Sequence, residues 1–394
     1  MKTYLLLFLS AACLIGCKKE NATSPVPIPD QTEINKLKIN QIQVLGSHNS
    51  YHKHMSQNMY SFLSNINFIL PSQYKVEGLD YYHEPWPDQL DKYHLRSFEI
   101  DIYADPQGGR FYNRQGNSFI NKPVASGIPE LMQPGLKVLH IPDIDFETYF
   151  YTFKSNLQYL KDWSDAHPDH LPIFILIESK EQTVGDVLGF LGFTTAIKFT
   201  PAIADDIDAE IKSVFGNDLS KVITPDNVRG TYSTLNEAVL AKNWPTVGES
   251  RGKFMFAMEG PAVDDYLNGH PSLQGRAMFL IGPAGNPESA VIGEDSPKGP
   301  NQTRIIDEVN QGYFIRTRAD EPNHENKTGD YSRQLAAFSS GAQMISTDYY
   351  RADPRYLTQP NQFKNYSCKF PNGELARINP VSAADKQGVG VIAE

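Results

Sequence analysis

The sequence PIFILIESK at residues 172–180 decides the fold. It is a short run of β-branched and aromatic residues that carries ionisable groups only at its end, which indicates a buried parallel strand. Seven similar runs occur elsewhere, each followed by a polar cluster and then a helical stretch, so we predict eight strands in all. The other seven runs span residues 41–48, 97–103, 137–141, 253–259, 277–281, 312–318 and 342–348.

Helical patterns lie between the predicted strands. Residues 147–165 place apolar side chains at three-and-four spacing, and residues 333–339 do the same before the last strand. Strands and helices in alternation over this length predict the α/β fold class and a (β/α)8 TIM barrel, in which functional groups lie at the carboxyl ends of the strands. A doubly wound open sheet is the alternative, but no glycine-rich phosphate-binding motif follows the first strand.

Length and composition set the class of protein. The 394 residues, 40% hydrophobic and 21% charged, are typical of a folded globular chain. The net charge of −10 provides no basic field for a phosphate backbone, so we expect no nucleic-acid partner. We predict a single barrel domain over residues 36–355, a C-terminal extension over 356–394 that packs on it, and a monomer.

The N-terminus has the pattern of an export signal. Residues 1–17 read MKTYLLLFLSAACLIGC, with a basic residue, an apolar run and then small residues, which predicts a signal peptide over residues 1–16. The last four letters resemble a bacterial lipobox, in which Cys17 is acylated and becomes the first residue of the mature chain. We expect residues 17–35 to form a lipidated start and a flexible linker. The predicted location is the bacterial cell envelope, exported and lipid-anchored, or freely secreted if the signal is cleaved elsewhere.

Acidic residues gather at the carboxyl ends of the second and fourth predicted strands. Glu99 and Asp101 are two residues apart, so they project to one side of their strand, as do Glu178 and Lys180. Three carboxylates that converge in a barrel mouth cannot all stay ionised without a compensating positive charge. That charge can come from a bound cation or, in the alternative interpretation, from a salt-bridge network of Lys180, Arg96 or Lys137.

The candidate metal ligands are hard oxygen donors. They favour Ca²⁺, with Mg²⁺ as the second choice, over zinc. These candidate ligands are Asn49, Glu99, Asp101 and Glu178.

Two histidines are predicted to share this end of the barrel. Of the ten histidines, only His48 and His140 end predicted strands on the presumed active face. Two imidazoles beside a divalent cation suit phosphoryl transfer, because one proton must leave the attacking oxygen and another must reach the leaving alcohol. Lys180, Arg316 and Arg318 are candidates for binding a substrate phosphate or hydroxyls, unless they pair with Asp348 or Glu259.

At these residues the chain resembles the calcium-dependent phosphoinositide-specific phospholipase C family, in its secreted bacterial and fungal form. The matching segments include LGSHNSYH at 45–52, RSFEIDIYADPQGG at 96–109 and VLHIPDID at 138–145. The resemblance implies that His48 and His140 are catalytic and that the four candidate ligands bind Ca²⁺. It also implies that the inositol 2-hydroxyl attacks the neighbouring phosphodiester, which yields a cyclic inositol phosphate and diacylglycerol. We expect His140 to act as the acid, His48 to stabilise phosphoryl charge, and Glu99 or Glu178 to act as the base.

Two alternatives to this function remain at the level of sequence. A glycerophosphodiester phosphodiesterase uses a similar barrel but usually has His-Arg-Gly after the first strand, where this chain has His-Asn-Ser. A surface lipoprotein could instead bind lipid headgroups or glycans without turnover. The presence of both histidines and all four candidate ligands together weighs against this second alternative.

Overall fold

The structure is a computed structural model, and it describes residues 31–394. The predicted signal peptide, Cys17 and most of the predicted linker lie outside the described residues. Helix α1 (Gln31–Lys36) occupies the end of the predicted linker region, and its Ile34 side chain is buried. Across residues 31–394 the structure has no helix that is both long and apolar enough to cross a membrane.

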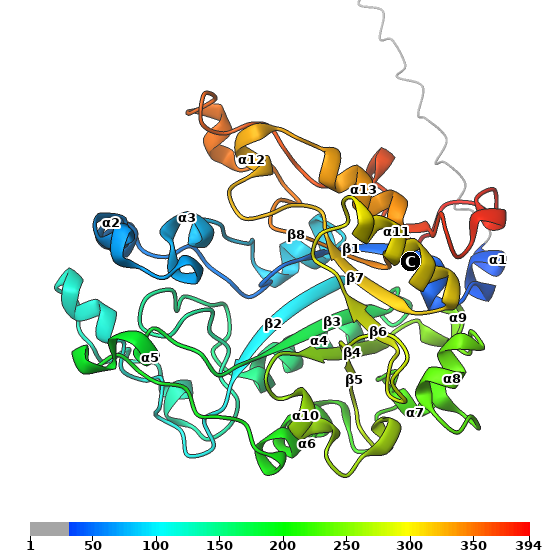
Figure 1. Cartoon of the computed structure of the whole chain (residues 1–394), viewed down its shortest axis with the longest axis horizontal. Helices are drawn as coiled ribbons and strands as arrows, with labels where there is room; N and C mark the ends of the chain where they lie inside the picture. The colour runs from blue at the N-terminus through cyan, green and yellow to red at the C-terminus, as the bar shows by residue number, and fades with distance from the viewer. Residues whose placement is uncertain (1–30) are drawn as a thin grey trace, which may run out of the picture.

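Eight parallel strands form a nearly closed barrel at the centre of the molecule (Figure 1). Their order around the sheet is β5-β4-β3-β2-β1-β8-β7-β6, and one parallel bridge between Ile281 and Val291 joins the two outer strands. The predicted TIM-barrel fold is therefore confirmed. The strands are β1 (Ile42–Ser47), β2 (Ser97–Tyr103), β3 (Ile173–Lys180), β4 (Phe254–Glu259), β5 (Phe279–Leu280), β6 (Val291–Gly293), β7 (Phe314–Arg318) and β8 (Met344–Thr347).

The prediction of a strand at residues 137–141 is wrong. Strand β2 pairs directly with β3 along its whole length, so no strand lies between them. Residues 137–141 form isolated bridges within the long β2–β3 connection, where Val138, Leu139 and Ile141 are buried and so produce the same apolar pattern as a strand. The eighth strand is instead β6, whose three residues are too short for a recognisable alternation.

Helices surround the barrel (Figure 1). Helix α4 begins at Phe153, because the Thr152 side chain caps it by accepting a hydrogen bond from the Ser155 backbone at 3.1 Å; the predicted start at residue 147 was too early. The helix predicted at 333–339 is confirmed as α13 (Ser332–Ser340). Helix α4 spans Phe153–Ala166. The remaining helices are α2 (Gln57–Ile66), α3 (Val76–Leu79), α5 (Gly185–Leu188), α6 (Pro201–Phe215), α7 (Pro225–Arg229), α8 (Leu235–Leu240), α9 (Val247–Ser250), α10 (Val263–Leu267), α11 (Pro300–Gln311) and α12 (Glu325–Thr328).

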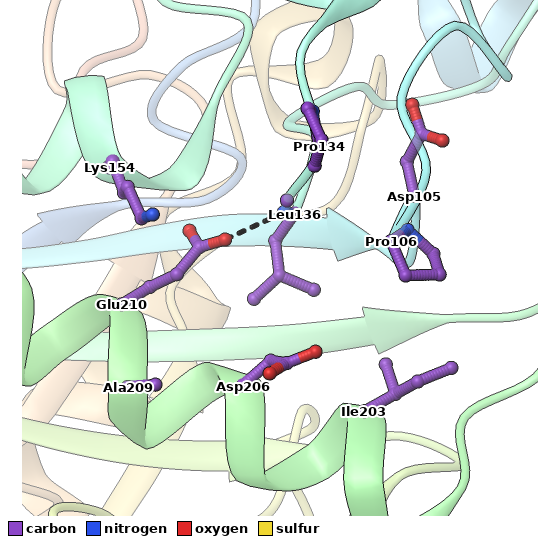
Figure 2. Close-up of a pocket in the computed structure, with 10 residues that line it drawn as sticks. Asp105, Pro106, Pro134, Leu136, Lys154, Ile203, Asp206, Ala209 and Glu210 are labelled. Atoms are coloured by element: carbon purple, nitrogen blue, oxygen red, sulfur yellow. Dashed lines mark hydrogen bonds between the residues drawn. The ribbon is translucent and has the colours of Figure 1, made fainter.

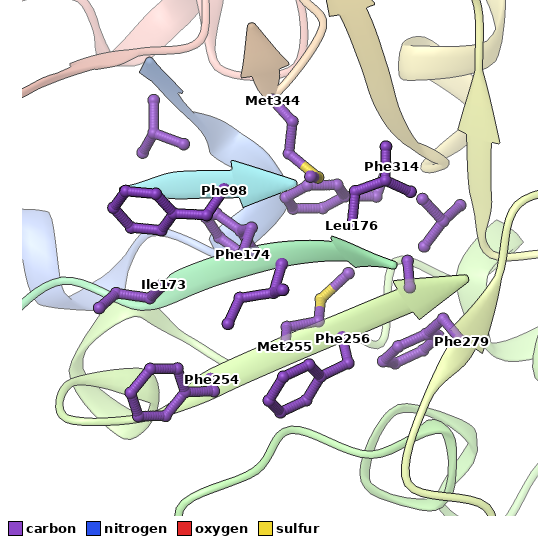
Figure 3. Close-up of a cluster of buried hydrophobic side chains, with 14 of the residues drawn as sticks. Phe98, Ile173, Phe174, Leu176, Phe254, Met255, Phe256, Phe279, Phe314 and Met344 are labelled. Atoms are coloured by element: carbon purple, nitrogen blue, oxygen red, sulfur yellow. The ribbon is translucent and has the colours of Figure 1, made fainter. Parts of the chain in front are cut away.

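The barrel contains, and is surrounded by, buried aromatic and aliphatic side chains, some of which Figure 3 shows. Phe174 of β3 and Phe314 of β7 meet inside it, with ring centroids 4.8 Å apart. A second apolar cluster, here called the loop cluster, lies under the connections at the carboxyl ends of the strands, and includes Met59, Leu63, Leu139 and Phe193. The interior is therefore packed, and functional groups must lie at the rim.

The C-terminal residues pack on the barrel. Strand β9 (Ala376–Ile378) pairs antiparallel with β1, and Tyr366 and Cys368 are buried. The guanidinium of Arg96 forms an ion pair with Glu394.

Buried polar contacts hold the loop that leads to His140 (Figure 2). A carboxylate oxygen of Glu210 on α6 accepts a hydrogen bond from the Leu136 backbone at 2.9 Å, beside a cavity of about 270 Å³. The Lys137 ammonium donates to the carbonyls of Gln133 and Gly135, each at 2.7 Å, and lies 3.4 Å from Asp105. Lys137 therefore fixes the path of this loop.

His170 makes the stability of the fold depend on pH. Its ring is buried at the amino end of β3, with Nε2 2.8 Å from Ser164 Oγ and Nδ1 2.6 Å from the Leu171 carbonyl. Burial lowers the pKa of His170 to about 4. The unfolded chain takes up this proton near pH 6.5, so the contribution to stability is complete above that pH and is lost as the pH falls toward 4.

We therefore expect the free energy of unfolding to fall between pH 7 and pH 4.5, by about 2 to 3 kcal/mol more in the wild type than in His170→Gln. Urea denaturation at the two pH values measures this difference. Equal pH dependence in the two proteins would show that His170 is not the group responsible.

Candidate active site

The carboxylates at the ends of β2 and β3 converge, as the strand pattern predicts. Asp101 on β2 lies in register with Glu178 on β3, which in turn lies in register with Glu259 on β4. Ligand oxygens of Glu99, Asp101 and Glu178 lie within 4.8 Å of one another. We call these three residues the carboxylate cluster.

Two basic side chains contact the carboxylate cluster. The Lys180 ammonium lies 2.6 Å from Glu178 Oε1 and 3.2 Å from Asp101 Oδ2. Arg316 donates from Nη2 to Glu99 Oε2 at 2.8 Å and also pairs with Asp295. The salt-bridge interpretation is thus correct for Lys180, whereas Arg96 and Lys137 pair with residues outside the cluster.

The Lys180 and Arg316 side chains do not balance all of the negative charge of the carboxylate cluster. Both carboxylate oxygens of Asp101 are buried; Oδ2 lies 3.2 Å from the Lys180 ammonium, and the Tyr51 hydroxyl contacts the same carboxylate. Burial raises the pKa of Asp101 well above its usual value, although Lys180 opposes this. Burial likewise raises the pKa of Glu259 to about 7, although Arg316 opposes it. Buried carboxylate oxygens that the basic side chains satisfy only in part fit a hard divalent cation such as Ca²⁺.

Asn49 lies beside the cluster at the end of β1. Its backbone is in the left-handed region at φ 49°, which asparagine tolerates better than most residues. The side-chain amide donates to the Tyr81 hydroxyl at 2.7 Å, and its oxygen accepts from the Tyr51 hydroxyl at 3.5 Å. Burial, and after it the charge of Asp101, raises the pKa of Tyr51, which places this hydroxyl near the cluster.

His48 follows β1 and lies between two carboxylates. Its Nδ1 is 2.8 Å from Asp348 Oδ1, and its Nε2 is 3.6 Å from Glu99 Oε1. Burial, and then the Arg318 charge, lower the pKa of His48 well below its usual value. Arg318 itself donates to Asp348 Oδ2 at 2.8 Å, so the alternative interpretation of Arg318 as a partner of Asp348 is correct.

His140 does not end a strand, contrary to prediction; it lies in the β2–β3 connection, which brings it to the mouth of the barrel. Its Nδ1 is 2.7 Å from Asp145 Oδ2, and the buried His52 contacts the same carboxylate at 2.8 Å. Burial opposes ionisation of Asp145, but His52 and the hydrogen bonds from both rings hold the pKa of Asp145 far below its usual value. Burial lowers the pKa of His140, and the hydrogen bond to Asp145 opposes that shift.

A cavity of about 660 Å³ opens beside the cluster, and His140, Glu178 and Lys180 line it. Of the three candidate substrate-binding residues, Lys180 faces this space. Arg316 is buried between Glu99 and Asp295, and Arg318 is held by Asp348, so these two arginines orient acidic residues.

Four residues of the site were not among the candidates from sequence. Asp145 lies five residues after His140, and Asp348 ends the last predicted strand, so both positions carried a usable signal. The signal for His52 was only that it follows His48 closely and so lies near the predicted mouth, and Tyr81 carried none because its partners are distant in the chain. The Tyr81 ring lies against His52 and His140, with centroid distances of 4.7 Å and 6.1 Å.

Together, the fold and the site define a TIM-barrel protein in which a candidate cation-binding carboxylate cluster and two aspartate-bound histidines share the mouth of the barrel. Residues 37–380 match the family described as phosphoinositide phospholipase C, Ca²⁺-dependent, and the chain belongs to this family. It is therefore a phosphoinositide phospholipase C family enzyme, which confirms the resemblance noted in the sequence. The family assignment also sets aside the phosphodiesterase and non-catalytic alternatives.

Solved structures agree with the fold. The calcium-dependent phosphoinositol-specific phospholipase C from a Pseudomonas species, in its apo form, is 14% identical with a TM-score of 0.50, covering 88% of this chain and 96% of that one. A structure of the same protein described as a myoinositol complex gives the same values. The Ca²⁺-dependent enzyme from Streptomyces antibioticus is 18% identical with a TM-score of 0.48, covering 80% of this chain and 95% of that one. None of the curated proteins matches this chain in sequence.

Proposed function

We propose that this enzyme cleaves phosphatidylinositol, or a related inositol phosphodiester, to a cyclic inositol phosphate and diacylglycerol. The observation that carries the proposal is the carboxylate cluster, in which Glu99 lies 3.6 Å from His48 and Glu178 lines the same cavity as His140, the partner of Asp145. This arrangement can hold a cation, transfer protons and receive a phosphodiester in one cavity. The inositol headgroup is supported by family membership and by the myoinositol complex of the Pseudomonas protein.

Asn49, Glu99, Asp101 and Glu178 would hold the cation. When bound, Ca²⁺ supplies positive charge that lowers the pKa of an attacking hydroxyl and offsets charge on the phosphoryl oxygens. Glu178 lines the cavity and is better placed than Glu99, which is bound to Arg316, to accept the proton of the inositol 2-hydroxyl. Because this nucleophile is part of the substrate, the site needs chiefly to orient it.

The two histidines act on opposite ends of the reacting phosphodiester. Asp145 remains ionised and stabilises the protonated form of His140, whose Nε2 delivers a proton to the diacylglycerol oxygen. The negative charge of the bound phosphodiester favours the protonated form of His48 against the burial that lowers its pKa, and this ring then donates from Nδ1 to Asp348 and from Nε2 to a phosphoryl oxygen. Both roles require the paired aspartates to hold the rings in position.

We propose that the preferred inositol ring carries hydroxyls and no further phosphates. Glu259 ends β4 in register with Glu178 on β3. An additional carboxylate at the mouth can accept a hydrogen bond from a ring hydroxyl and repels a ring phosphate.

Phosphorus NMR of the products tests the proposed function. Incubation of phosphatidylinositol with enzyme and Ca²⁺ should produce the resonance of a five-membered cyclic phosphodiester, and excess chelator should abolish it. Phosphatidylinositol bisphosphate, offered under the same conditions, should react more slowly. Full turnover in chelator would refute the calcium proposal, and release of glycerol phosphate from a glycerophosphodiester would refute the lyase chemistry.

We also propose that Cys17 is lipidated and holds the exported protein to the cell envelope. The support is the pattern in residues 1–17, in which small residues precede the cysteine at the end of the apolar run. Acyl chains on this residue would each bury many methylenes in a bilayer, at about 0.8 kcal/mol apiece. Cys17→Ser should therefore move the protein from the membrane fraction to the soluble fraction. Fractionation by ultracentrifugation measures this, and an unchanged distribution would argue against acylation.

A further inference from the structure

The Tyr81 side chain contacts both the histidines and a candidate metal ligand, and none of the proposed steps uses it. Tyr81 follows α3 by two residues and is buried. Its ring centroid is 5.7 Å from that of His48, and the rings of His52 and His140 also lie against it. Its hydroxyl accepts a hydrogen bond from the side-chain amide of Asn49 at 2.7 Å. Tyr81 therefore joins the histidines to Asn49.

The two ends of the Asn49 amide differ in what they offer a cation. The amide oxygen has lone pairs that can bind a cation, whereas the amide nitrogen carries two hydrogens and has none to offer. The nitrogen donates to Tyr81, and the oxygen accepts from the Tyr51 hydroxyl at 3.5 Å. The Tyr51 hydroxyl also contacts the Asp101 carboxylate. The oxygen of the amide therefore lies toward the carboxylate cluster, and the nitrogen lies toward Tyr81.

The backbone at Tyr81 is held from three sides through its neighbour Asp80. The Asp80 carboxylate accepts two hydrogen bonds from Nη1 of Arg355, at 2.8 Å and 3.0 Å, and lies 3.1 Å from Nε2 of His54. The side-chain amide of Asn323 donates to the Asp80 carbonyl at 3.1 Å. These three partners come from the segments that follow β8, β1 and β7. The surrounding fold therefore sets the position of Tyr81.

We propose that Tyr81 is a positioning residue for the calcium site, which holds the Asn49 amide with its oxygen turned toward the cation. This inference rests on the proposed function, because it takes Asn49 as a ligand of Ca²⁺. A hydroxyl suits the role, since it accepts the amide hydrogen without adding a charge to the site. Tyr81 acts through Asn49 and need not touch the cation or the substrate.

Loss of the Tyr81 hydroxyl should weaken calcium binding for a definite reason. Asn49 is buried, so its amide nitrogen would be left without an acceptor on the Tyr81 side. The carboxylate cluster offers acceptors instead, and an amide that donates to them has its nitrogen turned toward the place of the cation. The calcium-free protein gains from this reversal of the amide, whereas calcium binding requires the amide to turn back. The cost therefore falls on calcium affinity.

Calcium affinity tests the proposal without any need for turnover. Isothermal titration calorimetry of the full chain with Ca²⁺ gives the Kd of each variant. Tyr81→Phe removes only the hydroxyl and should raise this Kd by about 10-fold.

The matched control is Tyr313→Phe, in a second buried pair of tyrosine and asparagine. The Tyr313 hydroxyl donates to Oδ1 of Asn236 on α8 at 2.6 Å, and Tyr313 directly precedes β7, at the end of the barrel opposite the mouth. This variant also loses one buried hydroxyl and its hydrogen bond to an asparagine. Its Kd for Ca²⁺ should stay within about twofold of the wild-type value.

A double-mutant cycle separates positioning of Asn49 from general support of the fold. The second change is Asn49→Gly, because glycine tolerates the φ of 49° at this position. Tyr81→Phe should raise the Kd by about 10-fold when Asn49 is present, and by less than about twofold in the Asn49→Gly background. A hydroxyl that only supported the surrounding structure would cost the same in both backgrounds. Thermal unfolding without Ca²⁺ shows that each variant is folded.

Turnover separates this inference from the proposed function. Tyr81→Phe should cleave phosphatidylinositol more slowly than the wild type at limiting Ca²⁺, and added Ca²⁺ should reduce the difference. If the wild type binds Ca²⁺ with the expected dependence on Tyr81 but cleaves no phosphatidylinositol, the proposed function fails and the role of Tyr81 stands. Equal Kd values for Tyr81→Phe and the wild type, or equal losses in both Asn49 backgrounds, would overturn the role of Tyr81 alone. A wild type that binds no Ca²⁺ would overturn both.

Discussion

His140→Ala and His48→Ala should each lower kcat for phosphatidylinositol cleavage by about 10²- to 10⁴-fold. The first change removes the proton donor for the leaving oxygen, and the second removes a positive group from the phosphoryl oxygens. Both side chains are largely buried but lie at the rim of the barrel, bound to Asp145 and Asp348 respectively. The fold should therefore persist in both variants, which circular dichroism would show.

The matched control is His270→Ala. His270 lies in the connection between β4 and β5, where its Nδ1 lies 2.7 Å from the backbone carbonyl of Gln274. This variant should keep normal turnover in the same phosphorus NMR assay. Near-normal kcat in either His48→Ala or His140→Ala would remove that residue from the mechanism.

Asp101→Asn should change stability in opposite directions with and without calcium. Without Ca²⁺, the substitution removes a buried carboxylate whose burial costs more than its contact with Lys180 gains, as its raised pKa indicates, so the variant should be at least as stable as the wild type. With Ca²⁺ at about 100 times its Kd, the wild type should gain about 2.7 kcal/mol of stability. The variant should lose most of that gain, because a charged ligand is missing.

Thermal unfolding with and without Ca²⁺ measures these changes independently of activity, and turnover of the variant should fall by about 100-fold or more. Asp162→Asn, on the exposed face of α4, is the control and should retain the calcium-dependent shift. An equal calcium-dependent rise in stability in Asp101→Asn and the wild type would place the cation elsewhere.

The carboxylate cluster could be predicted from sequence because it depends only on strand geometry. Glu99 and Asp101 are two residues apart on a buried strand, and residues at that spacing share a face whatever the surroundings. Parallel strands place their carboxyl ends at one rim, so the approach of Glu178 follows once both segments are assigned as strands. The same reasoning located His48 and Asn49.

The position of His140 could not be predicted from strand geometry. Its segment has the apolar residues of a strand, but β2 and β3 pair directly and exclude it from the sheet. The segment is buried as a loop instead, under contacts that involve Lys137 and Glu210. A buried loop and a buried strand both require apolar residues, so composition could not distinguish them.

The sequence by itself determined the barrel, the converging carboxylates and the family, because these depend on local periodicity and on motifs within single strands. Only the tertiary structure decided that Asp145 serves His52 as well as His140, and that Arg318 belongs to Asp348. The physical reason is that these contacts join residues far apart in the chain, and their approach depends on how the long connections fold over the barrel mouth.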